Sequence, residues 1–342
     1  MQKLISFCVP CYNSEEYMRH CIDTLLTGGD EIEIFIINDG SKDGTSRIAH
    51  EYEKEHGNVT AVDKENGGHG SGVNKGLELA TGLYYKVVDS DDWLNAEGLA
   101  ELLTRLRADR DSDALCDLYI TNFIYDKVSE GTQFVRKFRK NFPEGKVCDW
   151  EKVKSFHTSS VLLMHSLLYR TGKLRESGIV LPEHTFYVDN LFAYQPLPYI
   201  KSICYLDIDL YHYFIGREDQ SVNADNIVKR YEQQIRIMKL AVSYYTYDEL
   251  CSMSKGLKKY MKHCLAVLMT LTLMFTVSGR QNVPKRKQDL KELWSFIRTR
   301  DRKMYRFLRR SYPALVDWMP FKMRGRVLFG GYMYYRKKLK CS

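Results

Sequence analysis

The sequence predicts an α/β fold in which a doubly wound, mostly parallel sheet is followed by a C-terminal α-helical region. The first hundred residues alternate short apolar runs with helix-length stretches, the pattern of parallel strands covered by helices on both faces. Each of these runs ends in a polar, glycine-rich or acidic segment. From about residue 226 onward, long amphipathic stretches replace the alternation and indicate helices.

The apolar runs of the first hundred residues have the length of buried strands. They are Leu4–Val9, Ile32–Ile37, Val59–Val62 and Leu83–Val88. The stretches between and after them predict helices at Ser14–Leu26, Thr45–Lys54, about Gly70–Ala80 and about Ala96–Leu106. Later segments predict strands at Leu118–Tyr125 and Gln133–Phe138, and helices at Ile227–Tyr245 and Leu257–Val277.

The charge of the chain is unevenly distributed. Residues 279–342 hold 19 Lys/Arg against 4 Asp/Glu, a net charge of +15, whereas the whole chain carries +8, so residues 1–278 carry −7. A basic end beside an acidic body suggests an anionic partner such as a membrane surface, or else a solvated helical surface. Since no recognised nucleic-acid motif accompanies this charge, nucleic acid is not expected as a partner.

Cysteine usage and hydropathy favour a cytoplasmic protein. The nine cysteines are odd in number, scattered and set in apolar surroundings, which fits a reducing compartment, and the pair Cys8 and Cys11 is expected to be structural. No secretory leader is visible before the first apolar run. The longest apolar run, Cys264–Val277, is about 14 residues long, short of the roughly 20 that span a membrane, so it predicts a buried helix.

The segments that follow the four predicted strands are expected to meet. In doubly wound sheets, ligands bind at the carboxyl ends of the strands. The segments there are Pro10–Asn13, Asn38–Gly44, Asn66–Gly70 and Asp89–Trp93. Four independent segments thus predict one ligand-binding rim.

The acidic segment after the fourth strand predicts a divalent cation. Asp89 and Asp91 occupy alternate positions of an extended chain and point the same way. Hard carboxylate oxygens suit Mg²⁺ or Mn²⁺, and such an ion neutralises charge on a departing diphosphate. The alternative is a helix cap, with Asp92 or Asn95 capping the helix from about residue 96.

Asp39 and the glycines after the third strand have ligand-binding chemistry. Asp39 can accept hydrogen bonds from a base N–H or a ribose hydroxyl; it can also cap the helix from Thr45, although Ser41 and Asp43 are better placed for that. Gly67 and its neighbouring glycines allow close approach of the backbone to a ligand. The segment matches neither the dinucleotide nor the Walker fingerprint, which argues against dehydrogenases and P-loop NTPases.

In order and spacing, four motifs resemble the family 2 inverting glycosyltransferases with a GT-A fold. The motifs are Pro10-Cys11-Tyr12-Asn13, Asn38-Asp39-Gly40-Ser41-x-Asp43-Gly44-Thr45, Asn66-Gly67-Gly68 to Asn74-x-Gly76, and Asp89-Ser90-Asp91-Asp92. The resemblance is dense over about residues 3–105 and looser to about residue 224. It implies a GT-A domain with a nucleotide-sugar-binding half (1–110) and an acceptor-binding half (111–224), before a basic helical region (225–342).

The resemblance also implies roles for residues on the rim. A UDP-sugar would lie across it, with Asp39 at the uracil, Asp89 at the ribose or sugar, and Asp91 on the metal, where Asp89 is a second candidate. The other residues that would bind substrate or nucleotide are Pro10, Tyr12, Asn13, Glu15, Asn66, Gly67 and Arg217. Arg217 belongs to a segment from Tyr211-His212-Tyr213 to Ser221 that resembles the part closing over the diphosphate.

The catalytic base of the family lies in an acidic pair before an aromatic-rich helix, and Tyr187–Phe192 resembles that motif. Asp189 fits the base, while Val188 stands where a glutamate is common. Direct displacement with inversion needs such a base on the face opposite the leaving group. Glu183 is the second candidate for the base, and a helix cap is the alternative role for Asp189.

Four histidines lie near these motifs, yet none stands at a ligand spacing from another, so each is expected to be structural or to face the substrate. They are His69, His165, His184 and His212. Only His212 is considered able to reach the metal or the diphosphate, provided that its aromatic segment folds inward.

The resemblance predicts an inverting transferase that moves a sugar to a hydroxyl of a glycan or lipid-linked acceptor, in cell-surface polysaccharide synthesis. The basic C-terminal end of the chain is expected to bind the inner face of the membrane. The first alternative is a sugar-nucleotidyltransferase, although a glycine-rich, Arg/Lys-bearing loop is missing after the first strand. The second is a non-catalytic module that binds sugar nucleotides.

Overall fold

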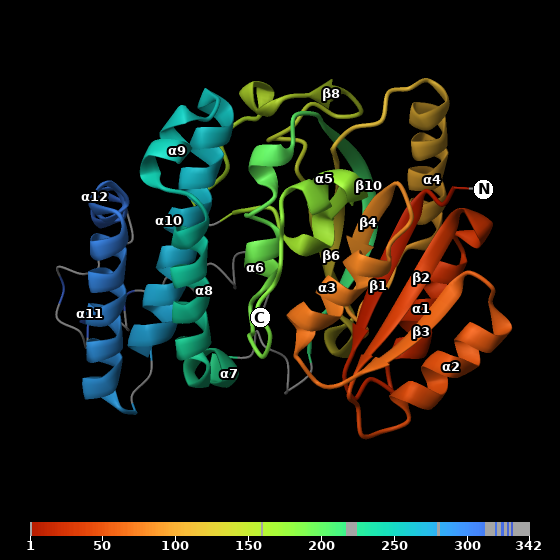
Figure 1. Ribbon diagram of the computed structural model, residues 1–342, viewed down its shortest axis with the longest axis horizontal. Coiled ribbons are helices and arrows are strands. Elements are labelled where there is room, and N and C mark those ends of the chain that lie inside the picture. The colour runs from red at the N-terminus through yellow and green to blue at the C-terminus, as the bar shows by residue number, and fades with distance from the viewer. Residues whose placement is uncertain are drawn as a thin grey trace.

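The computed structural model describes residues 2–158, 160–216, 224–278 and 281–311, together with residues 319, 323, 324, 327 and 330. Figure 1 shows a sheet flanked by helices in the N-terminal two thirds of the chain and a layer of helices beside it. Arg217 and Ser221 lie outside the described residues.

The sheet confirms the predicted fold class. Its strand order is β3-β2-β1-β4-β9-β6-β10-β5, with β7 paired to β6 and β8 paired to β10. Strands β3, β2, β1 and β4 run parallel, β9 is antiparallel to both β4 and β6, and β10 runs parallel to β6. The strands are β1 Ile5–Cys11, β2 Ile32–Asp39, β3 Val59–Lys64, β4 Tyr84–Val87, β5 Trp93–Leu94, β6 Leu118–Lys127, β7 Thr132–Arg136, β8 Val147–Cys148, β9 Leu167–Arg170 and β10 Ile203–Phe214.

Helices cover the sheet and then form the C-terminal region. They are α1 Met18–Leu26, α2 Thr45–Glu55, α3 His69–Leu79, α4 Ala96–Asp111, α5 Thr171–Glu176, α6 Asp189–Phe192, α7 Ala224–Lys229, α8 Tyr231–Tyr244, α9 Tyr247–Ser252, α10 Lys255–Ser278, α11 Val283–Arg300 and α12 Arg302–Arg310. The described residues also form 3₁₀ turns at Gly29–Glu31, Val128–Glu130, Trp150–Lys152, Met164–Ser166 and Leu197–Tyr199.

The central strands are buried because their sequences are apolar on both faces. Every residue of β1 is buried, as is every residue but one of β2, which is the pattern of a parallel sheet covered by helices on both sides. A fully buried large apolar side chain contributes about 1.5–3 kcal/mol to stability. Strand β4 pairs with β9, so residues 1–110 and 111–224 share one continuous sheet.

Two helix predictions differ from the structure in detail. Helix α1 begins at Met18 rather than at Ser14, because the backbone oxygen of Ser14 accepts the N–H groups of Tyr17 and Met18 in a preceding turn. The single helix expected at Ile227–Tyr245 is two helices, α7 and α8, which meet at Arg230 (φ −98°, ψ 21°). The remaining predicted strands and helices occur within a few residues of their expected bounds.

Helix α10 forms the centre of the C-terminal region. It is the one helix among the described residues whose length and composition would allow it to cross a membrane, and 67% of its apolar 18-residue window is buried. It packs against α7, α8, α9, α11 and α12. At its start, a Cβ on Gly256 would lie 1.9 Å from the backbone oxygen of Trp150, so the helix lies directly against the 3₁₀ turn at Trp150–Lys152. This packing agrees with the prediction of a buried helix.

Candidate active site

The loops after β1 and β2 are tied together at one edge of the sheet, the lower edge in Figure 1. Asn13 adopts a left-handed conformation (φ 50°); its N–H donates to Ser41 Oγ (3.0 Å) and its Oδ1 accepts from the N–H of Lys42 (2.9 Å). Glu15 Oε2 accepts the N–H of Gly44 (2.7 Å). Two expected nucleotide-binding residues, Asn13 and Glu15, therefore also fix the shape of the rim.

Asp39, at the end of β2, is 2% exposed and holds the glycine-rich loop after β3. Its Oδ1 accepts from the N–H of Gly67 (2.9 Å) and from Lys64 Nζ (2.7 Å), and its Oδ2 accepts from the N–H of Gly68 (2.7 Å). Asn66 Nδ2 donates to the backbone oxygen of Asp39 (2.8 Å). The predicted nucleotide-binding residues Asp39, Asn66 and Gly67 are thus brought together.

The alternative capping roles belong to other residues. Asp43 Oδ1 accepts the N–H of Thr45 (3.0 Å) at the start of α2, as the sequence indicated. Asn95 Oδ1 accepts the N–H of Gly98 (2.8 Å) and caps α4. Neither Asp39 nor Asp92 is needed as a helix cap.

The acidic segment after β4 is organised by a tyrosine of β10. Tyr211 donates its hydroxyl proton to Asp92 Oδ2 (2.5 Å), and its oxygen accepts the N–H of Asp89 (3.1 Å). Asp92 Oδ1 accepts the N–H of Phe214 (2.8 Å), and Asp92 is only 1% exposed. Burial, with Asp91 and Asp89 nearby, raises the pKa of Asp92 well above its ordinary value. Asp92 therefore anchors the segment internally, while Asp89 and Asp91 remain partly exposed.

His69, the first residue of α3, forms an ion pair with the acidic segment. Its Nε2 lies 2.7 Å from Asp89 Oδ1. Burial opposes the protonation of His69, but Asp89, with Asp189 and Asp91 beyond it, raises the pKa of His69 above its ordinary value. Conversely, burial acts to raise the pKa of Asp89, and the charge of His69 outweighs it and lowers that pKa.

Asp189 is the first residue of α6 and shares this environment. Burial is the main cause that raises its pKa to about 6; His69 opposes the shift and Asp89 adds to it. The N-cap of α6 is Val188, which is buried, and no side chain caps this helix, so Asp189 is not a helix cap. A carboxylate with a pKa near neutrality is suited to accept a proton during a reaction.

The loop that leads to Asp189 is docked onto the glycine-rich loop and α3. The N–H of His184 donates to the backbone oxygen of Gly67 (2.6 Å), and Asn74 exchanges two hydrogen bonds with the backbone of Leu181 (2.8 and 2.9 Å). A Cβ on Gly70 would lie 2.8 Å from the backbone oxygen of Pro182. The glycines, expected to admit a ligand, thus also admit the loop that carries Asp189.

Residues near the acidic segment can hold a divalent cation. Ligand atoms of Asp89, Asp92 and His165 lie within 4.8 Å of one another. His165 is buried, its pKa is lowered to about 4 chiefly by burial, and its Nδ1 has no partner among the described residues. The carboxylate oxygens suit Mg²⁺ or Mn²⁺, whereas an imidazole ligand is more typical of softer transition metals, and both oxygens of Asp92 already accept hydrogen bonds from Tyr211 and Phe214. Asp91, the expected metal ligand, is not in this group, so its role stays a prediction.

Other predicted residues have different places. Pro10 is buried at the end of β1, and Tyr12 beside it is 54% exposed, where a flat ligand can reach its ring. His212 pairs with Asp126 (2.9 Å) and its ring stacks on Trp93 at 5.1 Å. Glu183, the second candidate base, is exposed.

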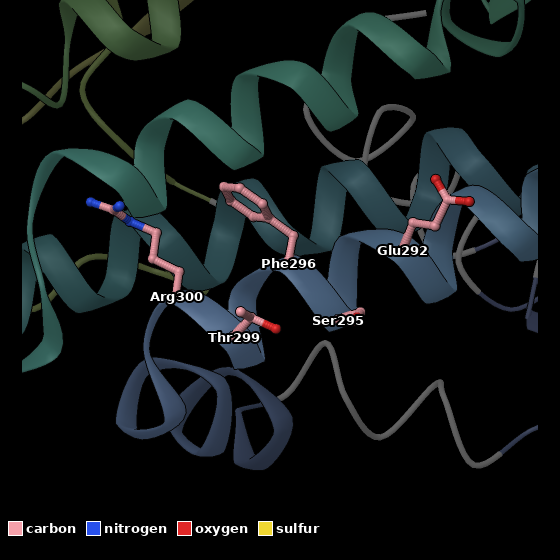
Figure 2. Close-up of a pocket in the computed structure, with 5 residues that line it drawn as sticks. All are labelled: Glu292, Ser295, Phe296, Thr299 and Arg300. Carbon is pink, nitrogen blue, oxygen red and sulfur yellow. The ribbon is translucent and has the colours of Figure 1, made fainter.

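One hollow of the described surface lies away from this rim. It has a volume of about 540 Å³ and is formed by Glu292, Ser295, Phe296, Thr299 and Arg300. Figure 2 shows these residues along α11. Since it contains no residue of the acidic or glycine-rich segments, it is not the candidate active site.

Sequence reasoning did not predict the contacts that His69, His165 and Tyr211 make at the site: the two histidines were expected only to be structural or to face the substrate, and Tyr211 was placed in the segment that resembles the part closing over the diphosphate. His69 lies within the glycine-rich motif, and its position opposite the acidic segment across the rim was the available signal. The spacing of residues gives no signal for the partners of the other two residues, since His165 lies in the 3₁₀ turn Met164–Ser166 and Tyr211 in β10, both far along the chain from the acidic segment.

Comparisons with known proteins agree with this geometry. Residues 6–172 match the model of glycosyl transferase family 2. Putative glycosyltransferase EpsH of Bacillus subtilis (strain 168) is 28% identical over 266 residues, covering 75% of this chain and 72% of EpsH. Chondroitin synthase of Escherichia coli is 26% identical over 262 residues, covering 74% of this chain but 35% of the synthase. The crystal structure of S. aureus TarS 1–349 in complex with UDP-GlcNAc covers 97% of this chain and 92% of that chain, with a TM-score of 0.66 at 21% identity.

The fold and the rim define an enzyme that transfers sugars. The chain is a glycosyltransferase with a GT-A fold, and its residues 6–172 match glycosyl transferase family 2.

Proposed function

We propose that this enzyme moves a sugar from a UDP-sugar, with inversion, to a hydroxyl of a glycan or lipid-linked acceptor in cell-surface polysaccharide synthesis. The observation that carries the proposal is Asp189: the loop that leads to it is docked on the glycine-rich loop through His184, and its carboxyl has a raised pKa on which the charges of His69 and Asp89 also act. The donor is supported by the UDP-GlcNAc bound to TarS, and the product class by the similarity to chondroitin synthase.

In the proposed mechanism, this chain's side chains orient both substrates and move one proton. Asp189 takes the proton of the acceptor hydroxyl as that oxygen attacks the anomeric carbon, and the bond to the diphosphate breaks on the opposite face. Because attack and departure occur in one step, the anomeric configuration inverts.

The nucleotide is held by residues of the three N-terminal loops, and Asp89 contacts the ribose or sugar. The loop residues are Pro10, Tyr12, Asn13, Glu15, Asp39, Asn66 and Gly67. Arg217 would contact the diphosphate. Asp91, with Asp89 as a second ligand, would hold Mg²⁺ or Mn²⁺, which when bound neutralises charge on the leaving diphosphate.

A panel of UDP- and GDP-sugars with Mn²⁺, scored for nucleotide release, tests the proposal. We expect one UDP-sugar to release UDP with the wild type and Asp91→Ala to lower the rate about 10²-fold or more, the scale of losing one electrostatic stabiliser of the leaving group. Release of pyrophosphate instead would indicate a sugar-nucleotidyltransferase. Binding of UDP-sugar without turnover would indicate a non-catalytic module.

We also propose that the enzyme works in the cytoplasm and attaches peripherally to the inner face of the membrane. Helices α11 and α12 are rich in Lys and Arg, and the strongly basic chain after residue 278 supports an anionic surface as partner. On α12, the exposed Arg302, Arg306 and Arg310 recur every fourth residue and so form one stripe.

A further inference from the structure

Phe186 presents an aromatic surface just before the expected base. Its side chain is 44% exposed, although large apolar side chains are usually buried, and it stands three residues before Asp189. The loop is held in place because the N–H of Leu181 donates to Asn74 of α3 and the N–H of His184 donates to the glycine-rich loop. Tyr187, next to Phe186, takes a left-handed conformation (φ 65°). An exposed ring on a fixed loop is suited to pack against the apolar face of a sugar.

Arg230 lies directly against this ring. Its guanidinium carbon is 3.9 Å from the centre of the Phe186 ring, and Arg230 stands at the junction of α7 and α8. Among the described residues it pairs with no carboxylate. A guanidinium that stacks by its face keeps its N–H edge available for a carboxylate or a phosphate.

Arg230 is a positive charge in a part of the chain that is negative overall. Residues 1–278 carry a net charge of −7, and the nearby rim is acidic, so an anionic acceptor would be repelled without a local cation. A second arginine of α8, Arg236, donates to the backbone oxygen of Glu183 (3.5 Å) in the same loop. In Figure 1, α7 lies at the same lower edge as the loops of the donor site.

We propose that Phe186 and Arg230 form an acceptor subsite that selects sugars carrying a carboxylate or a phosphate. The uncovered surface of the Phe186 ring packs on the sugar, and the N–H edge of Arg230 binds its anionic group. This assignment rests on the proposed function, because it makes the loop before Asp189 the acceptor side of the reaction.

Binding of simple glycosides to the full chain, with saturating UDP and Mn²⁺ to fill the donor site, tests the subsite. The probes are methyl β-D-glucuronide, methyl glucoside 6-phosphate and neutral methyl β-D-glucoside, measured by calorimetry. We expect the wild type to bind at least one anionic probe roughly tenfold more tightly than the neutral one, the scale of a charge-assisted hydrogen bond. The carboxylate and phosphate probes show which anion the subsite takes.

Substitutions then show which residues cause the preference for anionic probes. Arg230→Gln and Phe186→Leu should abolish the preference, whereas Lys229→Gln, which removes an exposed charge from the neighbouring residue, should keep it. Arg230→Lys keeps the charge without the planar stack and should retain part of the preference for anionic probes. It therefore shows that the loss in Arg230→Gln is not caused by a folding defect. Equal binding of charged and neutral probes by the wild type, or equal loss in Lys229→Gln, would overturn the subsite.

The two proposals fail in different ways. If UDP does not bind but the anionic probes still bind in an Arg230-dependent manner, the donor assignment is wrong and the subsite stands. If UDP binds and no anionic preference exists, the subsite is wrong and the donor assignment stands.

Discussion

At Asp189, burial and nearby charges compete to set the protonation state of the expected base. Replacement by asparagine keeps the shape and removes the proton acceptor, so we expect Asp189→Asn to lower the rate of UDP release by about 10²–10⁴-fold. Because the folded protein resists ionising this carboxyl, the variant should be at least as stable as the wild type in a thermal melt. A small loss of rate, or an equal loss in Glu183→Gln, would contradict the assignment.

The pH dependence of the reaction follows from the same residue. With a pKa of about 6, Asp189 is protonated below that pH and unable to accept the acceptor proton, so kcat should fall as the pH drops through about 6. The sign for stability is opposite: the raised pKa stabilises the fold below the ordinary value of 3.8, and this contribution is lost as the pH rises through about 6. A rate that is flat from pH 5 to 8 would argue against Asp189 as the base.

His69 connects the acidic segment with the base. Its positive charge lowers the pKa of both Asp89 and Asp189, so we expect His69→Gln to move the acid limb of the pH–rate profile to higher pH. His50→Gln is the matched control, because His50 also pairs with carboxylates but lies on α2. An unshifted acid limb in His69→Gln would show that Asp189 does not feel this charge.

At the residue scale, the motifs predicted where the rim residues meet but not which hydrogen-bond partners their side chains have. Asp39 was predicted to bind a nucleotide, and its carboxylate also holds Gly67 and Gly68. The acidic segment was predicted to be a ligand site, and one of its members, Asp92, is buried against Tyr211. The two glycines lie in the loop after β3 and Tyr211 lies in β10, so short-range spacing does not identify these partners.

At the scale of helices and loops, the close contact between α3 and the loop before α6 provides a test of how the site is assembled. A Cβ at Gly70 would lie 2.8 Å from Pro182 O and 3.0 Å from Leu181 Cβ, so Gly70→Ala should push the loop away and cost about 1–3 kcal/mol. We expect a lower melting temperature together with slower UDP release.

Gly172 in α5 provides the control for that substitution. Nothing lies within 4 Å of a Cβ built there, and the residue is helical, so Gly172→Ala should stabilise the enzyme by about 0.5–1 kcal/mol and leave turnover unchanged. If both alanine variants behave alike, the close contact at Gly70 has no special role.

Arg286 of α11 joins the ends of several helices in the C-terminal region. It is 5% exposed, donates to the backbone oxygens of Phe275, Thr276 and Val228, and stacks on Tyr231 at 3.9 Å. Loss of this buried network in Arg286→Ala should cost about 2–4 kcal/mol in a denaturant titration. Arg286→Lys is the informative companion, since a lysine cannot reach all three oxygens; full stability in either variant would contradict the role.

At the element scale, hydrophobic periodicity located the strands and helices of the first 111 residues except the short β5, because buried strands and amphipathic helices have distinct repeats. Further along the chain it located β6, β7, α8 and α10 but not β8, β9, β10, α5, α6, α9, α11 or α12. It placed the start of α1 too early and missed the break at Arg230. Both differences depend on local hydrogen bonds and packing at a helix end, which apolar spacing does not record.

At the scale of the whole molecule, the basic charge of the C-terminal region predicts that this region binds an anionic membrane. We expect Arg302→Gln/Arg306→Gln/Arg310→Gln to co-sediment with anionic vesicles more weakly than the wild type, by up to about 10²-fold, because each basic residue near such a surface contributes about 1 kcal/mol. Truncation after Ser278 is unsuitable, since α11 buries Leu290 and Leu293 against the rest of the protein.

The matched control for that stripe is Lys54→Gln/Lys140→Gln/Lys152→Gln, which removes three exposed charges from the sheet domain. It should bind the vesicles as the wild type does, and neither variant should bind neutral vesicles. Equal loss in both triple variants would show that net charge, rather than the α12 stripe, governs attachment.

The sequence by itself determined the fold class, the alternation of strands and helices in the first hundred residues, the edge of the sheet where the candidate site lies, and the uneven charge of the chain. Periodicity, turn residues and composition are local properties, and the rule that ligands meet at the carboxyl ends of parallel strands converts them into a place. Only the tertiary structure decided which side chains face one another. His69 on Asp89, Tyr211 on Asp92 and Arg230 on Phe186 are contacts between segments 20 to 119 residues apart, and burial and electrostatic pairing exist only once the chain has folded.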